Sequence, residues 1–262
     1  MKKNCKIVTT YFGNRRRYPH NFEESMDMFS KMIEKEKQVD AGIDCDTIIV
    51  NHLCEQNSHK VIELLDSLNG TKTKNGKIIT MNRPYDNGKG LGFKSRHYAF
   101  QKYKNNYEYW FFVEDDINFF LDDYYKKCVN ILKEKSHVAF VCTHFGGLTG
   151  GKGGHKSNHC VHCHGGIGCT HIKFLKELIN FNGKIPYTNF LPAYGVGLPS
   201  SNKNNRTERE STNLFVKMGY SLAKIDNVTD FPLFKKEQRM WHKKGLTKYD
   251  EYHPEKGYIK WK

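Results

Sequence analysis

Three consecutive carboxylates, Glu114-Asp115-Asp116, follow a strongly apolar run at residues 107–113. The run is rich in aromatic residues, and its length suits one buried β-strand. Carboxylates at the end of a buried strand are costly to desolvate unless a cation compensates their charge. Their hard oxygen atoms suit Mg²⁺ or Mn²⁺, which commonly lie between carboxylates and the phosphates of a substrate. The triplet therefore indicates a metal site or, in the simpler interpretation, a solvated acidic turn.

A glycine-rich turn upstream of the triplet has chemistry that complements it. Asn87-Gly-Lys-Gly90 precedes a predicted helix that contains Lys94 and Arg96. Glycines allow the backbone to approach a diphosphate closely, and Lys89, Lys94 or Arg96 supplies positive charge. Taken alone, the segment is an ordinary glycine-rich turn.

Strand and helix patterns alternate along the first half of the chain and define the elements that must position these residues. The predicted strands are 6–11, 46–50, 77–81, 109–113 and 138–142, and the predicted helices begin near 21 and 58 and span 93–103, 122–133, 171–180 and 210–219. Repeated β-α-β units predict a mostly parallel sheet covered by helices. Ligands of such sheets bind beyond the carboxyl ends of the strands, where the acidic triplet lies. We expect one domain over residues 1–262, with 235–262 as a basic C-terminal tail.

The composition limits the classes of molecule that the protein is expected to bind. The 262 residues carry a formal net charge of +14, which favours phosphorylated molecules or other anions. The charge is spread along the chain, so no nucleic-acid partner is expected. We find no apolar segment long enough for a transmembrane helix and no disulfide framework among the eight cysteines. These features predict a soluble cytoplasmic protein, and they leave its oligomeric state open.

The order of the motifs resembles that of a GT-A glycosyltransferase, nearest in pattern to the family 2-like enzymes. The resemblance covers about residues 5–225, with Glu-Asp-Asp as a variant of the family's Asp-x-Asp motif. It implies an α/β fold of the GT-A type, with a Rossmann-like, mostly parallel central sheet flanked by helices in a single domain. It also implies metal-dependent transfer of a sugar from a nucleotide-sugar, a UDP-sugar by expectation, to a hydroxyl of a glycan, protein or small molecule.

The resemblance assigns roles on the donor side. Glu114 would contact the nucleoside, Asp116 would bind the Mn²⁺ or Mg²⁺ ion that bridges the diphosphate, and Asp115 would assist. Such an ion neutralises charge that builds on the leaving nucleoside diphosphate. His242 matches a C-terminal histidine that ligates the metal or the diphosphate in many relatives, so the tail is expected on or near the donor site. The other expected donor-binding residues are Thr9, Thr10, Tyr11, Asn87, Lys89 and Arg96.

Tyr11 is placed to stack on the nucleotide base. The alternative interpretation of Thr9-Thr10-Tyr11 is a strand end closed by an aromatic side chain.

On the acceptor side, residues 164–168 resemble the small-residue segment that lines the acceptor in many GT-A enzymes. Residues 207–220 resemble the helix that carries the catalytic base of inverting members, with Glu210 at the Glu of that motif and Ser211 in place of its Asp. A serine cannot act as a general base without help, so Glu210 or Glu208 is the expected base. Otherwise the enzyme retains configuration or catalyses poorly. The simpler interpretation is a helix start that favours acidic residues.

Two other classes stay open. A metal-dependent nuclease or nucleotidyltransferase also uses paired carboxylates, for which Asp44 and Asp46 are the additional acidic candidates. A non-catalytic nucleic-acid or zinc-binding module would use the His/Cys-rich region, in which Cys160-x-x-Cys163 has the spacing of a zinc ligand pair. That region contains His155, His159, Cys160, His162, Cys163, His164, Cys169 and His171.

Replacing Asp116 with alanine is expected to abolish Mn²⁺-dependent hydrolysis of the donor, because the variant lacks the proposed metal ligand. Release of nucleoside diphosphate from the common nucleotide sugars measures this. Hydrolysis that is unchanged for all of them in Asp116→Ala would contradict the glycosyltransferase interpretation. Stoichiometric zinc in protein purified without chelators would favour the zinc-binding module instead.

Overall fold

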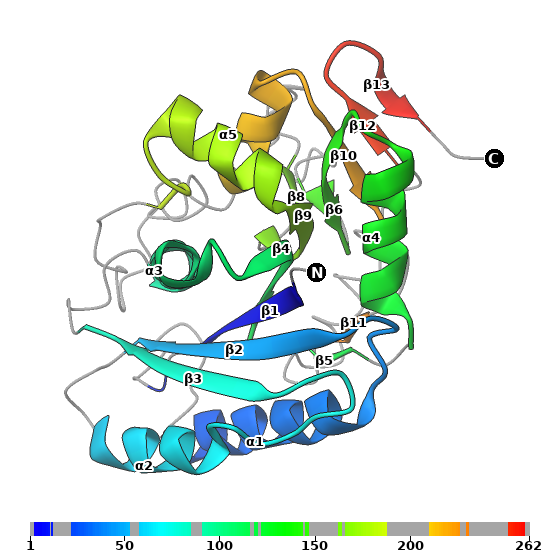
Figure 1. Ribbon diagram of the computed structural model, residues 1–262. Coiled ribbons are helices and arrows are strands. Elements are labelled where there is room, and N and C mark those ends of the chain that lie inside the picture. Colours follow the sequence, from blue (N-terminus) through cyan, green and yellow to red (C-terminus); the bar gives the residue numbers. More distant parts are fainter. Residues whose placement is uncertain are drawn as a thin grey trace, which may run out of the picture.

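A nine-stranded sheet forms the centre of the protein, and helices lie on both of its faces (Figure 1). The computed structural model describes residues 3–10, 12, 22–52, 58–84, 91–115, 118–119, 122–143, 145–146, 162–163, 166–187, 210–225, 229–230 and 251–259. In spatial order the strands are β13 (Gly257–Ile259), β12 (Glu251–His253), β10 (Ser221–Lys224), β6 (Val138–Cys142), β9 (Gly168–His171), β4 (Tyr107–Glu114), β1 (Lys3–Thr10), β2 (Cys45–His52) and β3 (Ile78–Arg83). The neighbours β4, β1, β2 and β3 are parallel, as are β6 and β10.

The helices follow the predicted alternation with the strands. They are α1 (Phe22–Gln38), α2 (Ser58–Leu68), α3 (Leu91–Tyr103), α4 (Tyr124–Glu134), α5 (Ile172–Asn182) and a further helix at 210–217. Figure 1 shows α1 and α2 together on one side of β2 and β3, with α3 on the other side. Two small ribbons complete the described elements: β5 (Asn118–Phe119) with β11 (Thr229–Asp230), and β7 (Phe145–Gly146) with β8 (His162–Cys163).

Strand β4 is buried on both faces, which explains its nearly continuous apolar sequence. Successive residues of a strand point to opposite faces of the sheet. Trp110 packs against Phe100 of α3 with ring centroids 5.0 Å apart, and Phe111 packs against Tyr125 of α4 at 5.2 Å. Both aromatic layers therefore fix β4 in the core, and its acidic end emerges at the edge of the sheet.

The predicted mostly parallel sheet flanked by helices is confirmed, and three additions to it were not predicted. Strand β10 pairs in parallel with β6. Strand β9 runs antiparallel between β4 and β6, in a region expected to be an acceptor loop and part of the His/Cys-rich region. Its four residues are small or polar, so pairing on both sides, rather than a hydrophobic pattern, makes them a strand. The hairpin of β12 and β13, within the basic tail, extends the sheet beyond β10.

Whether the tail also approaches the donor site stays a prediction, because residues 231–250 lie outside the described part of the chain. Among the described helices, none combines the length and apolar character needed to cross a membrane.

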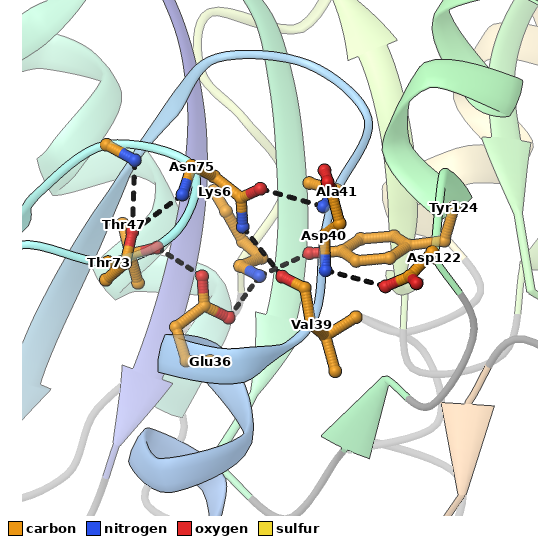
Figure 2. A network of polar contacts seen from close by, with 11 residues as sticks. Lys6, Glu36, Val39, Asp40, Ala41, Thr47, Thr73, Asn75, Asp122 and Tyr124 are labelled. Carbon is orange, nitrogen blue, oxygen red and sulfur yellow. Dashed lines mark hydrogen bonds and ion pairs between the residues drawn. The ribbon is translucent and has the colours of Figure 1, made fainter.

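A buried ion pair beneath β1 joins the sheet to two helices (Figure 2). Lys6 is 1% exposed, and its Nζ contacts the carboxylate of Glu36 in α1 and the hydroxyl of Tyr124 in α4. The hydroxyl of Thr47 in β2 donates a second hydrogen bond to Glu36, at 2.7 Å. Because a buried charge is costly without its partner, this pair makes the positions of α1, α4 and β1 depend on one another.

The loop that follows α1 is held by side chains from two other segments, which Figure 2 also shows. Asn75 accepts a hydrogen bond from the backbone N–H of Ala41 at 2.8 Å and donates one to the carbonyl of Val39 at 3.0 Å. Asp122 accepts from the backbone N–H of Asp40 at 2.8 Å. The turn before β3 and the segment before α4 are thereby fixed to the end of α1.

Replacing Lys6 with methionine is expected to lower the free energy of unfolding by about 3–5 kcal/mol, because it leaves Glu36 charged and buried without its partner. Urea denaturation measures the change. Adding Glu36→Gln to that variant should recover part of the loss, since no charge is then buried.

Lys31→Met is the matched control. Lys31 pairs with Asp27 on the exposed surface of α1, so its loss should cost less than about 1 kcal/mol. A Lys6→Met variant as stable as this control would contradict the structural role of the buried pair.

Candidate functional site

The carboxyl ends of β1 and β4 meet at one edge of the sheet. The two strands are parallel neighbours, and Thr9 lies opposite Glu114. Parallel pairing thus brings together the threonines and the first two carboxylates that the sequence analysis selected. This edge is where α/β sheets bind their ligands.

The two described carboxylates at the end of β4 have different environments. The side chain of Glu114 is 38% exposed. Asp115 is only 5% exposed, and its Oδ2 accepts a hydrogen bond from the hydroxyl of Thr10 at 2.8 Å. Glu114 is therefore accessible to a ligand, whereas Asp115 holds the ends of the two strands together.

The N-terminus of α3 closes against this edge. A Cβ atom on Gly92 would lie 2.7 Å from the hydroxyl oxygen of Thr9, so a larger residue cannot approach β1 as closely. The N–H groups of a helix's first turn carry partial positive charge and attract anions. The carboxylate of Glu114 and the start of α3 therefore offer complementary polarity near one strand end.

Arg96 of α3 is buried behind Glu114. Its side chain is 2% exposed, and its Nη1 donates a hydrogen bond to the carbonyl of Gly166 at 3.1 Å. Its Nη2 lies 4.0 Å from Glu114, the separation of a loose ion pair. The guanidinium carbon lies 4.5 Å from the ring centroid of Phe93 and 5.5 Å from that of Phe112, so the positive charge of Arg96 makes cation–π contacts with two aromatic rings.

A small cavity of about 20 Å³ adjoins Arg96 and has room for about one water molecule. Gly166 and the buried side chains of Ser211 and Thr212, from helix 210–217, contribute to its wall. Thr212 also accepts a hydrogen bond from the backbone N–H of Cys163 at 2.8 Å. The structure therefore brings the predicted acceptor segment and the predicted base helix together around Arg96.

Glu210 is the first described residue of helix 210–217 and is partly exposed. Ser211, which stands where the resemblance expects an aspartate, is 9% exposed and lines the cavity. A partly exposed carboxylate can accept a proton from a bound hydroxyl, whereas a buried serine cannot do so without a base. Glu210 thus stays the better candidate for a catalytic base.

Several predicted site residues lie outside the described part of the chain, and their roles stay predictions. They are Tyr11, Asn87, Lys89, Asp116, Glu208 and His242.

The described part of the His/Cys-rich region serves the fold. Cys163 and Cys169 are fully buried, and burial raises the pKa of both thiols. His171 Nδ1 accepts a hydrogen bond from the backbone N–H of Lys173, which caps α5, and His171 Nε2 lies 3.3 Å from Glu108.

Metal ligands are incomplete within the described residues. In that part of the chain no three His, Cys, Asp or Glu side chains lie close enough together to share an ion. The accessible oxygen atoms of Glu114 at the end of β4 nevertheless have the hard character that Mn²⁺ and Mg²⁺ prefer. An ion at this edge would also need Asp116, which lies outside the described part of the chain, so the metal site stays a prediction.

Three residues of this site were not predicted from the sequence: Phe93, Phe112 and Thr212. Phe93 lies three residues before Arg96 on a helix, and Phe112 lies two residues before Glu114 on a strand. Both spacings place side chains on one face, so this signal was present in the sequence. Thr212 gave no comparable signal, because its partner Cys163 is distant in the chain.

The fold is an α/β fold of the GT-A type, which confirms the predicted class. No protein-family model matches the sequence, and no curated protein matches it either. Among solved structures, CMP:2-keto-3-deoxy-manno-octonic acid synthetase complexed with CTP is similar, with a TM-score of 0.50 and 11% identity over 93% of this chain and 100% of that chain.

Two further solved structures have lower TM-scores. TarS of S. aureus has a TM-score of 0.48 and 11% identity over 86% of this chain, and the match covers 35% of TarS. A cytidylyltransferase from Leptospira borgpetersenii has a TM-score of 0.42 and 12% identity over 87% of this chain and 76% of that chain. The chain thus spans about a third of the length of TarS.

Replacing Thr10 with valine is expected to lower the free energy of unfolding by about 1–3 kcal/mol, because the buried carboxylate of Asp115 loses a hydrogen-bond donor. Thr10→Ser keeps the hydroxyl and should cost less than about 1 kcal/mol. Urea denaturation followed by tryptophan fluorescence compares the two variants. Equal stabilities would show that the hydrogen bond does not hold the ends of β1 and β4 together.

Proposed function

We propose that the protein is a transferase that binds an activated nucleotide at the carboxyl ends of β1 and β4, and that its donor is a nucleotide-sugar, specifically a UDP-sugar. The observation that carries the proposal is the pair of carboxylates at the end of β4. Asp115 is buried and bonded to Thr10, which holds the accessible carboxylate of Glu114 at the edge of the sheet. The fold is one in which ligands bind at this edge.

On the donor side, Glu114 accepts hydrogen bonds from the nucleoside, and Thr9 and Tyr11 line the pocket. The phosphates lie toward Asn87 and Lys89, before the N-terminus of α3, where glycines and partial positive charge favour an anion. Asp116 and His242 hold a Mn²⁺ or Mg²⁺ ion in this proposal. Such an ion, when bound, stabilises negative charge on the leaving nucleoside diphosphate.

On the acceptor side, Glu210 takes the proton from the hydroxyl that attacks the sugar, with Glu208 as the alternative base. The partial exposure of Glu210 supports this role, because a base has to be accessible to the acceptor hydroxyl. Ser211 lines the buried cavity and is not a base in this proposal. Direct attack by a single hydroxyl inverts the configuration of the sugar.

The proposed acceptor is a glycan, a protein or a small molecule rather than a nucleic acid. We also propose a cytoplasmic location. The six cysteines in the described part of the chain, all buried, are free thiols, which fits a reducing compartment.

A nucleotidyltransferase is the second candidate. The similar synthetase binds CTP, and the present chain covers the whole of that structure. In this alternative the carboxylates at the end of β4 would serve transfer of a nucleotidyl group, and pyrophosphate would be released instead of a nucleoside diphosphate. At 11% identity the similarity concerns the fold, so sugar transfer and nucleotidyl transfer have to be distinguished by their products.

A thermal-shift screen of UDP, CDP, GDP and CTP, each with and without Mn²⁺, tests nucleotide binding. We expect UDP with Mn²⁺ to stabilise the protein most, since a ligand at 100 times its Kd adds about 2.7 kcal/mol. Glu114→Gln should weaken UDP binding about tenfold, because a carboxylate accepts stronger hydrogen bonds than an amide.

Glu108→Gln is the matched control, since Glu108 lies on the same strand at its opposite end. No stabilisation by any of the four nucleotides, or equal effects of the two variants, would contradict a nucleotide site at Glu114. Release of UDP from a UDP-sugar supports the glycosyltransferase. Release of pyrophosphate from CTP in the presence of a sugar acid supports the nucleotidyltransferase.

A further inference from the structure

Arg96 contacts both sides of the candidate site. On one side its Nη2 lies 4.0 Å from Glu114, beside which Phe112 packs against the guanidinium. On the other side its Nη1 donates to the carbonyl of Gly166 at 3.1 Å. The Gly166 segment, residues 166–168, leads into β9, the strand that pairs with β4 and begins at Gly168.

The backbone conformation of Gly166 and its lack of a side chain allow this contact. Its φ is +59°, in the left-handed region that favours glycine. A Cβ atom there would lie 2.7 Å from Arg96 Nη1 and 3.0 Å from the hydroxyl oxygen of Ser211. The Gly166 segment is therefore packed directly between Arg96 and helix 210–217, with no space for a side chain.

The same geometry is unfavourable for direct contact with phosphate. The side chain of Arg96 is 2% exposed, and the rings of Phe93 and Phe112 lie within 5.5 Å of the guanidinium carbon. A cation that binds a diphosphate has to present its donors to the ligand. Here one guanidinium nitrogen donates to a backbone carbonyl while the other lies toward Glu114, a fixed spacing of two nitrogens that the single ammonium nitrogen of lysine cannot reproduce.

We propose that Arg96 is a positioning residue that couples Glu114, on the nucleotide side, to the Gly166 segment on the opposite side of the site. The resemblance assigned Arg96 to donor binding, whereas in this proposal its buried side chain does not contact the phosphates of the nucleotide. It holds the Gly166 segment against the end of β4, so that a ligand bound at Glu114 also orders the segment next to helix 210–217. The ligand-dependent part of this proposal rests on the proposed nucleotide site.

Hydrogen–deuterium exchange of the full chain tests the coupling, with wild type compared with Arg96→Lys. Without ligand, a peptide covering residues 166–168 should exchange about tenfold faster in the variant, as expected for loss of one charge-assisted hydrogen bond, while a peptide from β4 should be unchanged. With UDP and Mn²⁺, both peptides should be protected in wild type. Only the β4 peptide should be protected in Arg96→Lys, whose UDP Kd should change less than about threefold.

Two further variants make the result specific. Gly166→Ala crowds the same contact from the other side and should reproduce the faster exchange of the Gly166 segment with Arg96 intact. Lys102→Met removes an exposed charge from the same helix and should change neither exchange nor UDP binding.

Unchanged exchange of the Gly166 segment in ligand-free Arg96→Lys would overturn the proposal. A UDP Kd raised more than about tenfold in Arg96→Lys would also overturn it, because that is the result expected of a phosphate ligand. If wild type binds no nucleotide, the proposed function fails, and the ligand-free comparison still decides whether Arg96 holds the segment.

Discussion

The site depends on the parallel pairing of β1 with β4 and on the hydrogen bond that closes it, from Thr10 to Asp115. Parallel strands end at the same edge of a sheet, so Thr9 and Glu114 lie opposite each other in the two strands. The buried Asp115 then joins the two strand ends through one hydrogen bond, which is 2.8 Å long from Thr10 Oγ1 to Asp115 Oδ2. The accessible carboxylate of Glu114 is positioned by this buried neighbour.

The two faces of the sheet pack against different groups of residues. Phe111 faces α4 and the buried pair of Lys6 and Glu36, which joins β1 to its helices. The next residue, Phe112, faces α3 and contacts Arg96 beside the candidate site. Because successive strand residues alternate between faces, one strand packs toward the buried ion pair on one side and toward Arg96 on the other.

The sequence predicted the elements whose signals are local. The apolar run before Glu114 identified β4, and the run at 138–142 matched β6 at both ends. Strand β9 was missed because pairing with β4 and β6, and not its own four residues, makes it a strand. The contact between Arg96 and Gly166 joins residues far apart in the chain, so no spacing rule predicts it. Asp116 and His242, by contrast, stay predictions from the motif alone.

The central claim is that a nucleotide binds where β1 and β4 end. A crystal structure of the full chain with UDP and Mn²⁺ tests it most directly. We expect the ribose hydroxyls of UDP to lie within hydrogen-bond distance of the Glu114 carboxylate, with the diphosphate toward the N-terminus of α3. UDP bound elsewhere on the protein, away from the Glu114 carboxylate, would contradict a nucleotide site at the ends of these strands.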